Sequence, residues 1–238
     1  MVPVLTFMFE VQKVPAHNIL HLALGTSMAT IIFTSISSAW QHHAHRAVNW
    51  GAVLYITPGI LLGTALGALI VGLVSTFYIT IFFILFVYAS ATQMLLGLKP
   101  DATRDYPGRL EVTVAGMVIG AISSIVSIGG GVLSVPFLVW HKQSIRSAIA
   151  TSAAIGFPIA VGGTLGYIAT GLYGGRDLPA GSLGYVYLPV LLWLIIGTML
   201  TAPLGAKGTH RMPIDRLRKF FALLLFFLAT KMLLKLFV

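Results

Sequence analysis

The groups best suited to chemistry gather between residues 127 and 152. Three consecutive glycines, Gly129 to Gly131, sit inside apolar sequence, Pro136 follows them, and the hydroxyl pair Thr151-Ser152 opens the next apolar segment. Backbone N–H groups that a helix break leaves unpaired bind anions, and the start of the following helix adds a positive dipole end. This stretch therefore predicts a binding site for a compact oxyanion.

Three glycines in an apolar segment call for an explanation, because each glycine in a helix lowers its stability by about 1 kcal/mol relative to alanine. Non-helical backbone at membrane depth is tolerated only where protein or a water-filled cavity surrounds it. Ser127 and Ser134 flank the triplet and could donate hydroxyl hydrogen bonds to a substrate. Two other interpretations stay open: small residues also pack helices closely, and serines also bond back to helix carbonyls.

A hydroxyl pair recurs in the chain, as Thr26-Ser27 and Thr151-Ser152, each near the start of an apolar segment. Hydroxyls bind an oxyanion without the desolvation cost of a buried charge. Hydrogen bonding between helices is the alternative role. The predicted substrate-binding residues are Gly129, Gly130, Gly131, Ser127, Ser134, Thr26, Ser27, Thr151 and Ser152.

The composition fixes the class of protein that must position these groups. The 238 residues are 57% hydrophobic and 9% charged, whereas a soluble domain carries about 25% charged residues. Apolar runs near membrane-spanning length recur along the chain, so we expect an all-α, polytopic transmembrane helix bundle. The expected segments are 17–40, 48–74, 77–98, 110–140, 145–171, 183–205 and 215–237, with 1–9 as a short apolar remnant.

The net charge and the positions of the acidic residues limit the classes of function that the chain can have. The formal net charge is +9, which fits either basic cytoplasmic loops or attraction of an anion. Every acid lies in a loop or at a segment end, which disfavours cation and proton carriers. We expect no enzyme activity, cofactor, bound metal or nucleic-acid partner, since no acid–base or metal constellation and no P-loop is present. The acids are Glu10, Asp101, Asp105, Glu111, Asp177 and Asp215.

The chain repeats itself. Ala23–Ser27 resembles Ala148–Ser152 at an offset of 125, and residues 63–96 agree with 201–234 at 11 of 34 positions at an offset of 138. We therefore expect a first repeat over 1–97, incomplete at its N-terminus, a connecting loop over 98–109, and a second repeat over 110–238.

The basic residues indicate how the repeats are oriented. If 110–140 crosses the membrane once, the Lys and Arg residues, leaving out Lys231 and Lys235 near the C-terminus, divide 8 against 5 between the two sides. If it enters and leaves on one side, they divide 11 against 2, which obeys the positive-inside rule far better. An element broken at Gly129–Gly131 followed by three crossings would invert the second repeat, as in secondary transporters.

These residues together resemble the sulfite exporter TauE/SafE family of four-plus-four helix permeases. The resemblance rests on Ile128–Gly131 with Val135-Pro136, Ala150–Ser152, Gly25–Ser27 with Ser35–Ser38, His45-Arg46, and Gly59 through Gly67. The chain departs from the family at Ser127, where a glycine is frequent, and in lacking the N-terminal glycine motif.

The resemblance implies a multi-pass permease of the plasma membrane that moves sulfite, sulfonates or related sulfur-containing anions. Its partners would be the small anionic substrate, the lipid bilayer and a coupling ion, and alternating access between the repeats would carry the substrate. An anion channel and a non-transporting membrane scaffold remain the alternatives.

Overall fold

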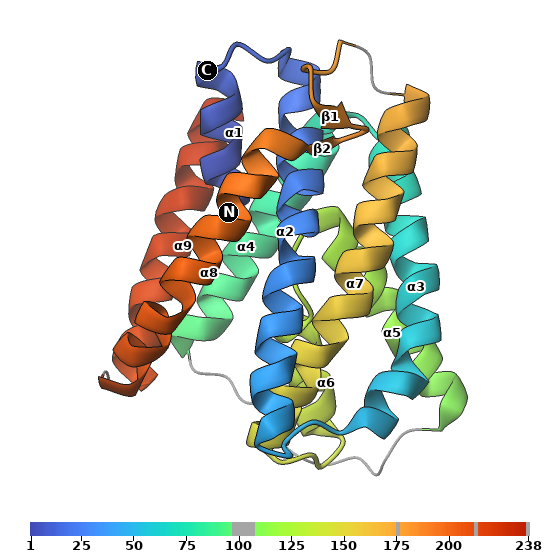
Figure 1. Cartoon of the computed structure of the whole chain (residues 1–238), viewed down its shortest axis with the longest axis vertical. Helices are drawn as coiled ribbons and strands as arrows, with labels where there is room; N and C mark the ends of the chain where they lie inside the picture. The colour runs from blue at the N-terminus through green and yellow to red at the C-terminus, as the bar shows by residue number, and fades with distance from the viewer. Residues whose placement is uncertain (97–107, 175–176, 212–213, 237–238) are drawn as a thin grey trace.

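The computed structural model is a bundle of helices that run along one long axis (Figure 1). It describes residues 1–96, 108–174, 177–211 and 214–236, with the backbone alone at 199–200, 202–218 and 235–236. The described helices are α1 (Val2–Val11), α2 (Ala16–Ala44), α3 (Trp50–Leu73), α4 (Thr76–Leu96), α5 (Arg109–Val126), α6 (Gly131–Trp140), α7 (Ile145–Gly174), α8 (Leu188–Arg211) and α9 (Ile214–Leu236).

The expected all-α polytopic bundle is confirmed. Among the described residues, α2, α3, α4, α5 and α7 are long and apolar enough to cross a membrane, and α1, α6 and the first part of α8 are shorter apolar helices. Large apolar side chains cover much of the outer surface, including Leu54, Phe82, Leu85 and Trp193. A surface of this kind is stable in contact with lipid and not with water.

The two ends of the bundle differ in charge. We call one the basic end, because the α2–α3 and α6–α7 connections and the start of α5 bring Arg46, Lys142 and Arg109 there (bottom in Figure 1). The other is the hairpin end, with the α1–α2 and α3–α4 connections and a small β-hairpin. Lys99, Arg104 and Arg176, which also entered the charge count, lie outside the described residues.

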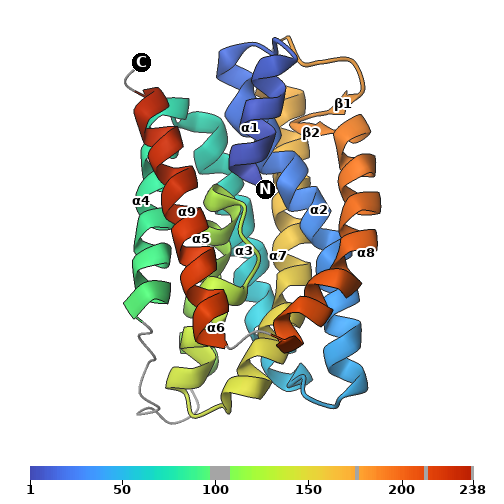
Figure 2. The ribbon, with the colours of Figure 1, turned by 90° about the vertical axis from the view of Figure 1, so that its left-hand side faces the viewer.

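The segment 110–140 is a re-entrant element rather than one crossing. Helix α5 rises from the basic end and stops at Val126, residues 127–130 are not helical, and α6 returns to the basic end (Figures 1 and 2). Ser127 ends α5 in the left-handed conformation, with φ 53° and ψ 48°. Glycine adopts this conformation without strain, whereas a serine adopts it at a cost in free energy.

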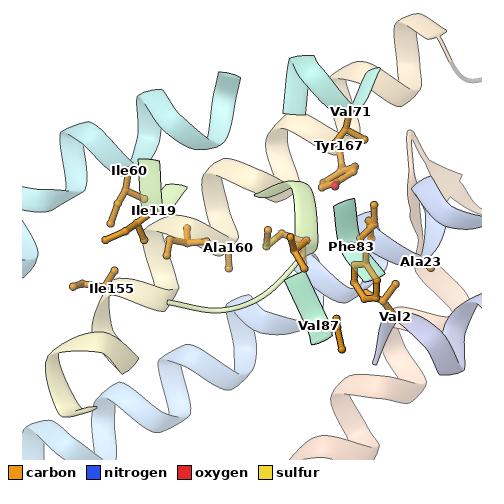
Figure 3. Packing of buried hydrophobic residues seen from close by; sticks show 14 of the residues in the cluster. Val2, Ala23, Ile60, Val71, Phe83, Val87, Ile119, Ile155, Ala160 and Tyr167 are labelled. Carbon is orange, nitrogen blue, oxygen red and sulfur yellow. The ribbon is translucent and has the colours of Figure 1, made fainter. Parts of the chain in front are cut away.

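Close helix contacts hold this element in place. Helix α3 lies between α5 and α7, and Gly59, Gly63 and Gly67 of α3 face the backbone of α5, where a Cβ would meet a carbonyl. Gly116 and Gly120 of α5 face the backbone of α3 in return. Small residues spaced by four let membrane helices approach to backbone contact. Figure 3 shows Ile60, Ile119, Ile155 and Ala160 from the same three helices in one buried cluster.

The segment expected at 183–205 begins differently in the structure. Residues 182–187 form the hairpin of β1 (Ser182–Leu183) and β2 (Val186–Tyr187), and the helix starts at Leu188. Gly181 and Gly184 have φ of 88° and 55°, a conformation that only glycine adopts freely, and they turn the chain here. The apolar composition of 183–187 concealed the hairpin, in which Tyr185 and Val186 are buried whereas Leu183 is exposed.

Corresponding helices of the two halves match in length and run in opposite directions. Helices α1 and α6 each have 10 residues, and α3 and α8 each have 24. In Figures 1 and 2, α1 rises towards the hairpin end whereas α6 descends, and α3 rises whereas α8 descends. The same opposition holds for α2 against α7 and for α4 against α9.

Candidate anion site at the glycine break

A cavity of about 1080 Å³ reaches from the glycine break towards the basic end. Gly129, Gly130 and Gly131 all line it, so the break predicted from sequence opens onto a space that water or a ligand can enter. The walls come from the second half of α2, the second half of α4, α6, the first half of α7, and Leu225 of α9.

Five consecutive backbone N–H groups at the break, from Gly129 to Leu133, donate no hydrogen bond to another described residue. The first backbone bond of α6 runs from the Ser134 N–H to the Gly130 carbonyl, at 2.8 Å. An unpaired N–H inside a membrane protein costs free energy unless a ligand or water accepts its hydrogen bond. The start of α6 also carries the positive end of the helix dipole.

Two carbonyl groups near the end of α5 are already occupied. The Ser123 carbonyl accepts from the Ile128 N–H at 3.1 Å, and the Ser124 carbonyl accepts from the Tyr167 hydroxyl at 2.8 Å. The break therefore presents a row of consecutive unpaired donors at the cavity. A cluster of consecutive backbone N–H groups favours an anion over a cation.

Two side-chain hydroxyls lie beside these donors. The Ser134 Oγ is completely buried, has no hydrogen-bond partner among the described residues, and lies 3.1 Å from where a Gly130 Cβ would be. The Ser152 Oγ lies 3.9 Å from where a Gly131 Cβ would be, and Ser152 lines the cavity. Both hydroxyls can turn a hydrogen towards an anion at the break.

Two residues that the sequence did not single out as site residues complete this inner end. Gly156 of α7 has no side chain to fill the space, and a Cβ there would lie 3.9 Å from the Gly130 nitrogen and 3.5 Å from the Ser35 Cβ. Ser35 of α2 is buried and lines the same cavity. They lie on two separate helices, α2 and α7, so only the folded structure brings them next to the break. We call this inner end, with Gly129–Gly131, Ser35, Ser134, Ser152 and Gly156, the glycine tip.

Besides the fully buried Ser134, four of the sequence-predicted residues do not line the cavity. Ser127 donates to the Leu24 carbonyl at 2.7 Å. The Thr26 hydroxyl oxygen accepts from the Tyr187 N–H, and that of Thr151 accepts from the Asn49 N–H, both at 3.0 Å. Ser27 is buried and does not line the cavity. A substrate contact for these four stays a prediction.

The hairpin end is closed above the glycine tip. Tyr185 of the hairpin is buried between Gly25 of α2 and Gly171 of α7, where a Cβ on either glycine would meet its backbone. Its N–H donates to the Tyr167 carbonyl at 3.2 Å, and its ring lies 4.9 Å from that of His21. Access to the glycine tip is therefore from the basic end.

The described lining of the cavity has polar groups but no permanently charged side chain. Among its described lining residues there is no Asp, Glu, Lys or Arg. Within the described part of the chain, no group of three or more His, Cys, Asp or Glu residues could hold a metal ion. The site would therefore rely on backbone and hydroxyl donors, which bind anions in preference to cations.

The fold and the site define a polytopic helical membrane protein with a re-entrant, ligand-accessible break. A family model for the sulfite exporter TauE/SafE matches residues 1–232, and the chain belongs to this family. It is therefore a membrane transporter protein by family.

Curated relatives agree with this assignment. A "Probable membrane transporter protein" of Haemophilus influenzae is 36% identical over 235 residues, which cover 98% of this chain and 89% of the relative. A protein of the same description from Methanocaldococcus jannaschii is 28% identical, with 91% of this chain and 79% of the relative covered. Bacillus subtilis YdhB, also described so, is 27% identical over 83% of this chain and 78% of its own. No solved structure matches the chain significantly.

Proposed function

We propose that this protein is a secondary transporter of the plasma membrane for small sulfur-containing anions such as sulfite or organosulfonates. The observation that carries the proposal is the row of unpaired N–H groups from Gly129 to Leu133 at the inner end of the cavity. Sulfite and sulfonate groups are compact oxyanions with several acceptor oxygens, which suit a cluster of backbone donors. The sulfur-containing class itself is carried over from the family description.

In an alternating-access cycle, this structure would be one of the two end states. The cavity opens towards the basic end, and basic loops face the cytoplasm. We infer that this is the inward-facing state, with the hairpin end closed around Tyr185. Passage to the other state would open the hairpin end and close the basic end.

A reciprocal pair of hydrogen bonds supports an inverted-repeat relation between the halves. Thr26 and Thr151 differ by the offset of 125, and Asn49 and Tyr187 differ by the offset of 138, the two offsets of the sequence repeat. Thr26 accepts from Tyr187 whereas Thr151 accepts from Asn49, so each half ties down the start of a helix in the other half. Together with the opposed helix directions, this pattern fits the architecture of secondary transporters.

The proposal differs from its alternatives in kinetics. A carrier saturates and exchanges labelled for unlabelled substrate across the membrane, whereas an anion channel gives flux that stays nearly linear to high concentration. A scaffold or a membrane enzyme gives no exchange. The cavity lining includes no residue of the β-hairpin, and the hairpin end is closed around Tyr185, which favours a carrier.

The test is exchange of labelled sulfite in proteoliposomes. We expect saturable exchange by the unaltered protein and loss of exchange by Gly130→Leu, because the new side chain would fill the space towards Ser134 and Ile155. Gly197→Leu is the matched control, since Gly197 has nothing within 4 Å of its Cβ position. Normal exchange by a folded Gly130→Leu protein would rule out the glycine tip as the anion site.

A further inference from the structure

The cavity is much larger than its anion-binding tip. Its volume of about 1080 Å³ reaches the upper end of the range typical for small-molecule sites, about 300–1,000 Å³. The unpaired backbone donors of the cavity lining lie at the glycine break. A bare sulfite ion, one sulfur atom with its oxygens, would fill the tip alone and leave the rest to water.

The two long walls of the cavity differ in polarity. The wall from α2 is polar, with Thr34, Ser38 and His42 at helical spacing on one face. The wall from α6 and the start of α7 is apolar. It consists of Val132, Val135, Pro136, Val139, Ile145 and Ile149.

Two hydroxyls of α2, Thr34 on the polar wall and Ser35 at the tip, already donate to carbonyls of their own helix. Thr34 donates to the Ile31 carbonyl at 3.2 Å, and Ser35 donates to the Ile32 carbonyl at 2.9 Å. They present mainly acceptor lone pairs to the cavity, which do not attract an anion. The backbone N–H groups of the tip, rather than these hydroxyls, are therefore the place for the charge.

We propose that the preferred substrate is an organic anion with an apolar body, bound with its anionic group at the glycine tip and its body along the α6–α7 wall. This inference rests on the proposed function and specifies its substrate class. Burial of each methylene against Val135, Val139 and Ile149 removes apolar surface from water, and a bare inorganic oxyanion gains nothing there. The apolar wall thus selects among anions that the tip alone would treat alike.

A homologous series of competitors tests the proposal. Methane-, ethane-, propane- and butanesulfonate would compete with labelled sulfite for exchange in proteoliposomes. We expect the inhibition constant to fall roughly three- to fourfold for each added methylene. Alkylammonium ions of the same lengths serve as the control for partition into the bilayer and should not compete.

Two isosteric variants test whether the dependence on alkyl chain length arises at the α6–α7 wall. Val135→Thr and Val139→Thr keep the side-chain volume but add a hydroxyl to the apolar wall, so they should flatten the chain-length series. Val118→Thr is the matched control, because Val118 of α5 is exposed on the outer surface and does not line the cavity. It should keep the full series.

The outcomes separate this inference from the function on which it rests. Equal competition by sulfite and every sulfonate would overturn the apolar-body proposal and leave anion transport intact. Absence of any anion exchange would overturn the proposed function itself. Competition by the alkylammonium series as strong as by the sulfonates would overturn the placement of the charged group at the glycine tip.

Discussion

The proposed preference for an anion rests on the backbone donors that the break leaves free. Ser127 closes α5 in the left-handed conformation and donates its hydroxyl to the Leu24 carbonyl, while the Ser124 carbonyl accepts from Tyr167. The donors from Gly129 to Leu133 are not used within the described residues. A neutral site with such a row of donors would bind an anion without the cost of burying a lysine or arginine in the membrane.

Two serine variants should separate structural from binding roles. Ser134→Ala removes a buried hydroxyl that has no partner, so we expect unchanged or slightly higher stability, by up to about 1 kcal/mol, and about tenfold weaker anion binding. Ser127→Ala loses a buried hydrogen bond, so we expect a loss of about 1–3 kcal/mol with anion affinity preserved.

The measurements are denaturant unfolding in detergent and sulfite binding by calorimetry. A Ser134→Ala protein that unfolds more easily and binds sulfite normally would show that this hydroxyl is structural.

At the scale of elements, the re-entrant element formed by α5 and α6 depends on α3, the helix that α5 packs against. Gly59, Gly63 and Gly67 bring α3 into backbone contact with α5, and Gly162 and Gly166 of α7 meet α3 on its other side. These contacts fix where α5 ends and hence where the break lies. The glycines of the break are the proposed anion-binding groups, whereas the glycines of α3 position the break.

Gly63→Ala should destabilise the protein by about 2–3 kcal/mol, because its Cβ would overlap the backbone of Met117 and force α3 and α5 apart. Gly197→Ala on α8 is the control. Its Cβ meets nothing within 4 Å, and the gain in helix propensity is up to about 1 kcal/mol. Thermal midpoints of the two purified variants check the difference. Similar midpoints would mean that the α3–α5 contact does not hold the fold.

The sequence predicted the elements better than their contacts. Gly129–Gly131 marked the break because glycine triplets are costly in a membrane helix, a local and strong signal. The hairpin at 182–187 was missed because its residues are apolar and its partners lie far away in the chain. Thr26 and Thr151 were recognised as a matched pair, but their bonds to Tyr187 and Asn49 depend on how the halves pack. Gly156 and Ser35 carry no local signal at all.

At the scale of the whole molecule, one end is open and the other is closed. Helices of the two halves run in opposite directions, so the arrangement that opens the basic end has a counterpart that would open the hairpin end. The inverse positions of Thr26 and Thr151 would keep the starts of α8 and α3 anchored in both states. The central claim is that an anion reaches the glycine tip from the basic end.

The chain contains no cysteine, so a single engineered thiol can report on this access. Ser38→Cys places a thiol on the cavity wall between the glycine tip and the basic end, and Gln12→Cys places one on the exposed hairpin end. The measurement is the rate of modification by a membrane-impermeant maleimide in oriented vesicles, with and without saturating sulfite.

We predict that the Ser38→Cys thiol reacts only from the side of Arg46, and that sulfite slows the reaction severalfold unless Gly130→Leu is also present. The Gln12→Cys thiol should react only from the opposite side, without an effect of sulfite. Modification of Ser38→Cys from the hairpin side alone, or protection by sulfite that persists with Gly130→Leu, would contradict the account.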